Sequence, residues 1–182
     1  DLMYVGLNDR DPAWHDLYSL SISTGELTKL RENTGRYTSW IFDWDDQLRL
    51  ASRSKPNGDN ELWRLDADGT ETLIYEWTLM ENARPIGFHK DNEQIFLVSN
   101  KGEDVDKSQL YLMDINTGEK VLFEGDPENR VDFGGLWQSE KTREVIATTY
   151  VDERSRVYFH DKGFERHYQF MKEQLGDIEL SF

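Results

Sequence analysis

The stretch LYSLSISTGELTKL (residues 17–30) recurs, with changes, at two later places in the chain. The counterparts are LWRLDADGTETLI (residues 62–74) and LYLMDINTGEKVLF (residues 110–123). In each stretch apolar and polar residues roughly alternate, a turn containing glycine follows, and a second run begins. Alternation with a period of two is typical of a half-buried strand, so each stretch predicts a β-hairpin. Because a tight hairpin turn favours positive φ, we expect it at or beside the structural turn residues Gly25, Gly69 and Gly118.

The hairpins belong to a longer repeat. A fourth, degraded copy, RVYFHDKGFERHYQF (residues 156–170), has Lys162-Gly163 at its expected turn. An aromatic residue followed three positions later by an acid recurs with nearly the same period, and an apolar run follows each time. Each repeat therefore contains two coupled hairpins. The anchors of the hairpin series are Leu17, Leu62, Leu110 and Val157, and those of the aromatic series are Phe42, Phe88 and Trp137, with Phe182 next in line.

Two coupled hairpins in about 45 residues are the content of one four-stranded β-propeller blade. The sequence therefore predicts an all-β fold, a partial β-propeller of about 3.5–4 four-stranded antiparallel blades. Closed propellers have about 4–8 blades, so we expect an arc whose open blade edges invite self-association. A sandwich built from the same short strands is the alternative. The expected single propeller segment has blades near residues 1–33, 37–80, 84–126 and 131–175, and a further blade starts at 177–182.

Within each blade, the first strand is expected to lie innermost, near residues 38–43, 84–88 and 132–137. Gly87 and the pair Gly134-Gly135 fall in these strands, where crowding around the propeller axis would favour a missing side chain. The outermost strands are predicted in ELTKL, TETLIY, EKVLF and ERHYQF. Helix is expected for a turn or two at most, in YQFMKEQLG.

Composition excludes several classes of protein. The net charge of −15 over 182 residues argues against nucleic acid and against anionic membranes as partners. The chain contains no cysteine and no apolar run of the ~20 residues that a membrane span needs. It starts at Asp1 directly in a strand-like run, LMYVGL, which we interpret as a piece of a longer, cytoplasmic protein.

No motif of known chemistry is present, so we expect no catalytic residues and no cofactor in this chain. G-x-S-x-G, the P-loop and H-E-x-x-H are all absent. DADG at residues 66–69 resembles the start of a calcium loop but lacks its later ligands, so a hairpin turn explains it better. No metal site is expected from the histidines, because they fall at non-equivalent places in the repeat: His15, His89, His160 and His167.

Side chains on the predicted inner strands are the candidates for a substrate-binding channel. Aromatic residues there could grip a peptide, although packing between sheets explains them equally well. Acids at blade turns could attract a cationic substrate, or they could bind nearby backbone amides. The candidate channel residues are Trp40, Asp43, Arg84, Asp132 and Trp137.

The segment NDRDPAWHDLYSLSISTGELTKL (residues 8–30) resembles the propeller of bacterial prolyl-oligopeptidase-family serine peptidases, in the acylaminoacyl-peptidase and dipeptidyl-peptidase-like branch. The repeats WRLDADGTET and YLMDINTGEK also resemble the blades of TolB-type propellers. The residues that carry the first resemblance are Asn8, Arg10, Asp11, Pro12, His15, Asp16, Tyr18 and Thr24-Gly25-Glu26.

The resemblance implies a non-catalytic propeller that gates and selects peptides for a C-terminal α/β-hydrolase domain carrying a Ser-Asp-His triad. That domain and peptides would be the partners. The adjacent Glu-Glu pair of some dipeptidyl peptidases is absent, and Asp152-Glu153 is the nearest counterpart. One alternative is a TolB-like protein- or ligand-binding propeller without peptidase activity, and a third is an enzyme with its active site at the propeller axis. A G-x-S-x-G motif encoded beyond Phe182 would distinguish the first two.

Overall fold

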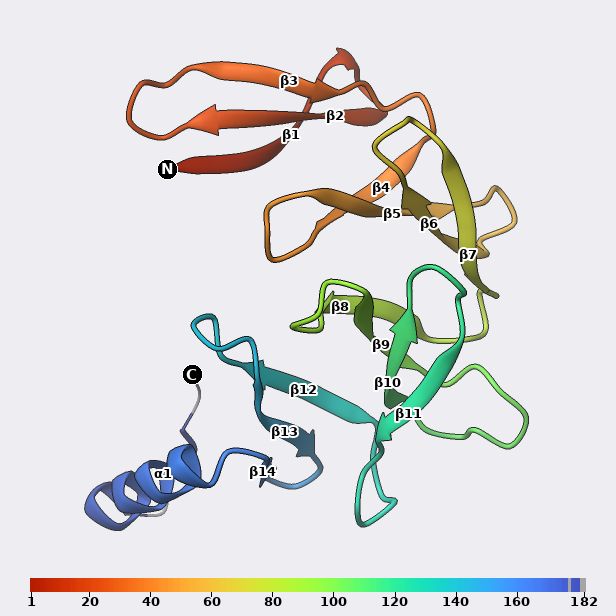
Figure 1. The fold of residues 1–182 in the computed structure, drawn as a ribbon. Helices are drawn as coiled ribbons and strands as arrows, with labels where there is room; N and C mark the ends of the chain where they lie inside the picture. Colours follow the sequence, from red (N-terminus) through yellow and green to blue (C-terminus); the bar gives the residue numbers. More distant parts are fainter. Residues whose placement is uncertain (177, 181–182) are drawn as a thin grey trace. The chain divides into compact units, whose positions relative to one another are not determined.

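The computed structural model describes residues 1–176 and 178–180, and its described part contains fourteen strands and one helix. All strands belong to four antiparallel sheets in which consecutive strands pair (Figure 1). This all-β arrangement confirms the predicted fold class. The chain divides into two compact units, Asp1–Met80 and Glu81–Phe182, which are described separately below.

The first unit contains a three-stranded and a four-stranded sheet, each a simple meander. The three-stranded sheet is formed by β1 (Leu2–Asp11), β2 (Trp14–Ser21) and β3 (Leu27–Arg31). The four-stranded sheet is formed by β4 (Tyr37–Phe42), β5 (Leu48–Ser54), β6 (Asn60–Leu65) and β7 (Glu71–Trp77).

The second unit repeats the pattern with a four-stranded sheet followed by three strands and a helix. The first sheet contains β8 (Ala83–Phe88), β9 (Gln94–Ser99), β10 (Gln109–Asp114) and β11 (Lys120–Glu124). The second contains β12 (Phe133–Gln138), β13 (Val145–Val151) and β14 (Ser155–Phe159), and α1 (Lys162–Leu175) follows it.

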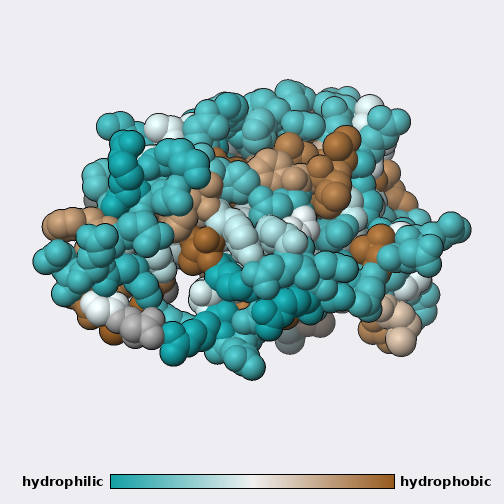
Figure 2. Space-filling model, turned by 90° about the horizontal axis from the view of Figure 1, so that it is seen from below, coloured by the Kyte–Doolittle hydropathy of each residue, from teal (hydrophilic) through white to brown (hydrophobic). Residues whose placement is uncertain are grey.

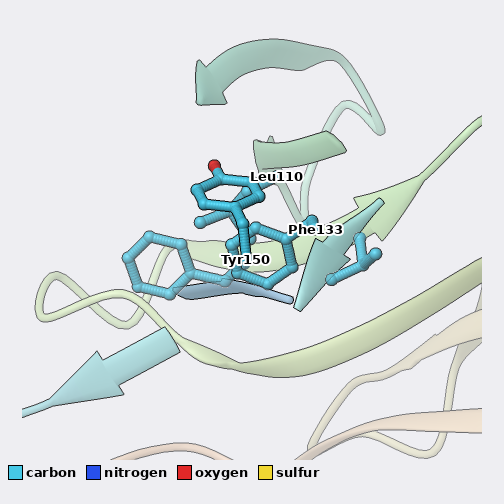
Figure 3. Close-up of a cluster of buried hydrophobic side chains, with 5 residues drawn as sticks. Leu110, Phe133 and Tyr150 are labelled. Atoms are coloured by element: carbon cyan, nitrogen blue, oxygen red, sulfur yellow. The ribbon is translucent and has the colours of Figure 1, made fainter. Parts of the chain in front are cut away.

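The core of the second unit lies where its two sheets meet. Phe96 and Leu110 come from the first sheet and pack with Phe133 and Tyr150 from the second, and all four are at most 5% exposed (Figure 3). The rings of Phe133 and Tyr150 meet edge to face with 5.8 Å between their centroids. Edge-to-face packing places the positive edge of one ring on the negative face of the other, and it adds a favourable cross-strand contact between the paired strands β12 and β13.

The outer surface is mostly polar. Figure 2 shows hydrophilic residues over most of the visible face, with small and separate hydrophobic areas. This distribution agrees with a sequence in which 31% of residues are charged and acids outnumber bases by 36 to 21.

The expected fourth outer strand is wrong, because its residues form α1. Asp161 caps the helix by accepting hydrogen bonds from the backbone N–H groups of Gly163 (2.7 Å) and Phe164 (3.0 Å). Phe164 and Tyr168, one helical turn apart, both pack on Trp137 and Phe159. Lys162-Gly163 is therefore the first turn of a helix and not a hairpin turn. Residues 178–180 form no strand, and the rest of the expected further blade, residues 177, 181 and 182, lies outside the described residues.

The glycines of the predicted inner strands lie at β-bulges, and crowding at the propeller axis stays a prediction. The register of β12 against β13 shifts between Phe133 and Gly135, and that of β8 against β9 shifts between Pro85 and Gly87. A Cβ on Gly134 would lie 2.7 Å from the carbonyl oxygen of Thr149, in the neighbouring strand of the same sheet. At Gly134 the close approach is thus made within one sheet, where the bulge brings the two backbones together.

The turn glycines have the left-handed backbone that the hairpins require, with φ of 74° at Gly25, 89° at Gly69 and 74° at Gly118. We expect Gly69→Ala to lower the free energy of unfolding by about 1 kcal/mol through φ alone, because no atom lies within 4 Å of the new Cβ. Gly134→Ala should cost more, since its Cβ meets backbone. Urea denaturation of both variants checks this, and equal costs would contradict it.

Candidate functional site

The loop between β3 and β4 is held by a buried carboxylate. Asp16, whose side chain is fully buried, accepts hydrogen bonds from Arg10 Nε (2.9 Å) and Nη2 (2.8 Å), from Lys29 Nζ (3.1 Å) and from the backbone N–H of Asn33 (2.8 Å). The hydrogen bonds from Arg10, more than those from Asn33 and Lys29, hold the pKa of Asp16 well below its usual range despite burial. Asn33 in turn binds both the N–H and the carbonyl of Tyr37, each at 2.8 Å.

Arg10 and Asp16 belong to the segment whose resemblance pointed to a peptidase propeller. Asp16 holds the loop without the side chain of the adjacent His15. The His15 side chain lies against Gly6, 3.2 Å from where a Cβ would stand, and only its backbone carbonyl binds the loop, through Asn33 Nδ2 (3.1 Å).

Beside this loop the first unit has a pocket of about 580 Å³. Its lining includes Glu61, which is 5% exposed, accepts hydrogen bonds from Arg53 Nε (2.7 Å) and Trp63 Nε1 (2.8 Å), and pairs with Lys55 (3.1 Å). Burial raises the pKa of Glu61, but these hydrogen bonds outweigh it and lower the pKa. The lining, which contains three bases and one acid, consists of Trp14, Thr34, Gly35, Arg36, Arg53, Ser54, Lys55, Pro56 and Glu61.

The second unit has the same construction at the β11–β12 loop. Asp126 accepts two hydrogen bonds from Arg156, each of 2.8 Å, and the backbone N–H groups of Arg130 (2.8 Å) and Val131 (3.0 Å). The paired Arg156 is the main reason that the pKa of Asp126 lies well below its usual range. The adjoining pocket of about 570 Å³ has two acids and two bases, and it is lined by Asp106, Lys107, Arg130, Val131, Asp132, Phe133, Gly134 and Val151.

Three of the five predicted channel residues are buried or half-buried and have structural contacts. Trp40 packs on Tyr37 with 5.2 Å between ring centroids, and Trp137 packs under α1. Asp43 accepts the backbone N–H groups of the turn that follows it and pairs with Arg49 at 3.0 Å. The contacts of these three agree with the structural alternative.

The other two predicted channel residues are more accessible. Arg84 is exposed on β8, while Asp132 accepts the backbone N–H of Ser108 (2.7 Å) and lines the pocket of the second unit. Because Trp40 and Asp43 belong to the first unit and the remaining three to the second, a common channel stays a prediction.

Two histidines that the sequence placed at non-equivalent positions are brought together in the second unit. His89 and His160 line one pocket of about 590 Å³. His160 Nε2 lies 2.9 Å from Glu124, and His89 Nδ1 lies 2.8 Å from Asp91 without hydrogen-bond geometry. Within residues 1–176 and 178–180, however, no three His, Asp or Glu side chains are placed to hold a metal ion.

The DADG motif is a hairpin turn, as its spacing indicated. Asp68 accepts the backbone N–H of Thr70 (2.9 Å), and Asp66 pairs with Arg64 (2.9 Å). Both carboxylates are thus occupied by groups of the same hairpin.

In sequence, the chain is similar to known peptidases. Over 149 residues, 80% of its length, the chain is 30% identical to dipeptidyl aminopeptidase BIII of Pseudoxanthomonas mexicana. Over 181 residues, 94% of its length, it is 22% identical to dipeptidyl peptidase family member 6 of Caenorhabditis elegans. It spans 21% and 24% of these two relatives. No family model matches the chain.

Similarity to a solved structure identifies the fold of the chain. TolB from Acinetobacter baumannii superimposes with a TM-score of 0.51 at 16% identity, covering 80% of this chain and 34% of that one. The chain is a β-propeller segment related to dipeptidyl peptidases. For this propeller segment, the resemblance predicted from residues 8–30 and from the repeats is confirmed. None of the helices described in the propeller segment has the length and apolar character that crossing a membrane requires.

Proposed function

We propose that the chain is the non-catalytic propeller part of a serine peptidase, and that it gates and selects the peptides that reach a hydrolase domain of the same protein. The similarity over 80% of the chain to one fifth of a dipeptidyl aminopeptidase supports this proposal most directly. The catalytic residues would then belong to the remaining length of the parent protein. The absence of G-x-S-x-G from these residues agrees with that division.

The loop pockets suit a selecting role. In each unit a buried Asp that is paired with an Arg holds a loop that borders a pocket, so the backbone of that loop is in place before a peptide arrives. Preorganised groups lose little conformational entropy on binding, which favours recognition of one ligand over another.

We expect the purified chain to leave dipeptidyl p-nitroanilides intact, because it contains no recognisable nucleophile–base pair. The protein encoded by the complete gene should hydrolyse the same substrates and lose this activity with a serine-directed inhibitor. Release of p-nitroaniline from both proteins, measured at equal concentration, checks the prediction. Inhibitor-sensitive hydrolysis by the isolated chain would overturn the non-catalytic assignment.

Gating is tested by substrate length. The complete protein should cleave peptides of a few residues, and its rate should fall steeply for an unfolded protein with the same amino-terminal sequence. Equal rates for short and long substrates would contradict a gate.

The similarity of fold to TolB favours a second candidate, a binding propeller without peptidase activity. In that case the complete gene would encode no G-x-S-x-G motif.

A further inference from the structure

The pocket of the first unit contains hydrogen-bond donors that the chain itself leaves unused. Among the residues that the structure describes, the Arg36 guanidinium and the Trp14 indole N–H have no acceptor. The lining has three basic side chains against one acid, Glu61. A pocket with excess positive charge is unexpected in a chain of net charge −15.

Arg36 is exceptional among the arginines of this unit. Acids outnumber bases in the sequence, so an arginine finds a carboxylate easily. Each of the other arginines in residues 1–80 lies within 4.0 Å of one. Arg36 has no such partner. The paired arginines are Arg10, Arg31, Arg49, Arg53 and Arg64.

The backbone holds Arg36 in place. Its φ of 58° lies in the left-handed region, which is unfavourable for a residue with a long side chain. The neighbours impose this conformation: Asn33 binds the backbone of buried Tyr37, and Gly35 lies against the Tyr37 ring so closely that a Cβ would stand 2.3 Å away. A strained backbone conformation at a well-anchored loop position supports the hypothesis that the residue there has a function.

We propose that this pocket binds a carboxylate of a peptide, with Arg36 as its principal donor. The guanidinium presents N–H groups in a planar fork that matches the two oxygens of a carboxylate. Arg53 and Lys55 already share Glu61, and Lys55 also pairs with Glu76, so one cation remains uncompensated. One such cation suits a singly charged carboxylate better than a doubly charged phosphate. That the carboxylate belongs to a peptide rests on the proposed function.

The test is a binding titration of the purified chain, followed by NMR shifts of backbone and indole N–H signals. The probes are acetyl-Ala-Ala-Ala with a free carboxyl terminus, the same peptide as its amide, and acetyl-Ala-Glu-Ala amide. A carboxylate peptide should shift the N–H signals of Trp14 and Arg36, and the neutral amide should bind about tenfold more weakly or not at all. The two charged probes distinguish a terminal from a side-chain carboxylate.

The variant Arg36→Asn removes the charge while keeping a residue that tolerates positive φ. It should weaken binding of the charged probe about tenfold and leave binding of the neutral probe unchanged. Arg143→Asn is the matched control, because Arg143 also has positive φ (61°) but lies in the second unit, outside this pocket. Its affinity should equal that of the wild type.

Three results would overturn the inference: equal affinity for the charged and neutral probes, wild-type affinity in Arg36→Asn, or full displacement of the peptide by an equal concentration of inorganic phosphate. The last would identify a general anion site. The test measures binding and not hydrolysis, so it is separate from the proposed function. If the complete protein releases dipeptides but its propeller binds no carboxylate, the pocket assignment is refuted and the proposed function is not.

Discussion

Replacing Asp126 by asparagine should lower the free energy of unfolding of the second unit by about 3 kcal/mol. The carboxylate is 1% exposed and meets Arg156 through two hydrogen bonds of 2.8 Å. Asparagine keeps one acceptor but turns an amide donor toward the guanidinium. Asp152 (3.1 Å) and Glu128 (3.2 Å) remain near Arg156, so we expect the lower end of the range for breaking a buried pair.

The prediction can be checked by urea denaturation together with amide hydrogen exchange of the β11–β12 loop. Exchange should accelerate at Arg130 and Val131, whose N–H groups bind Asp126. Asp106→Asn is the control, because Asp106 is 87% exposed and pairs with Lys107 at the surface. Its effect should stay within about 0.5 kcal/mol. Equal effects of the two substitutions would show that the buried pair does not hold this loop.

Replacing Asp16 by asparagine should lower the melting temperature of the first unit by on the order of 10 °C. Asp16 is fully buried and holds two cations and the loop that borders the Arg36 pocket. The control is Glu32→Gln, since Glu32 is half exposed and lies 3.7 Å from the same Arg10. Scanning calorimetry should show little change for the control, and a similar shift in both variants would contradict the assigned role.

The same residue predicts how stability depends on pH. Hydrogen bonds from Arg10 first, and from Asn33 and Lys29, hold the pKa of the folded carboxyl below its unfolded value of about 3.9. The stabilisation is therefore complete above that value and is lost as pH falls through it toward the folded pKa. The wild type should lose stability as pH falls below about 4, and Asp16→Asn should lose less over the same interval. Parallel pH profiles of the two proteins would contradict the prediction.

The hairpins and their turns could be predicted from the residues alone because they are local. Alternating runs around Gly25, Gly69 and Gly118 need only neighbouring strands to form, and positive φ at these glycines follows from the geometry of a short turn. The even spacing of the hairpins then predicted the blades, because one four-stranded meander takes about 45 residues.

The helix shows where local pattern is insufficient. FERHYQF (residues 164–170) fits a strand by its aromatic spacing, but Phe164 and Tyr168 also lie one helical turn apart. The Asp161 cap and the packing of the helix on Trp137 and Phe159 favour the helix over a strand. Packing against Trp137 and Phe159 overrides a weak local preference, so the residues alone predicted only a turn or two of this helix.

The candidate site depends still more on tertiary structure. Trp14 begins β2, Arg36 lies in the β3–β4 loop and Lys55 follows β5, and no spacing in the sequence relates them. The same holds for His89 and His160, which lie 71 positions apart and line one pocket. Periodic apolar residues determine which strands pair, because burial of their side chains drives folding. The polar loops at the strand ends carry no such period, so only the folded sheets and the buried Asp16 and Asp126 pairs determine which loop residues meet.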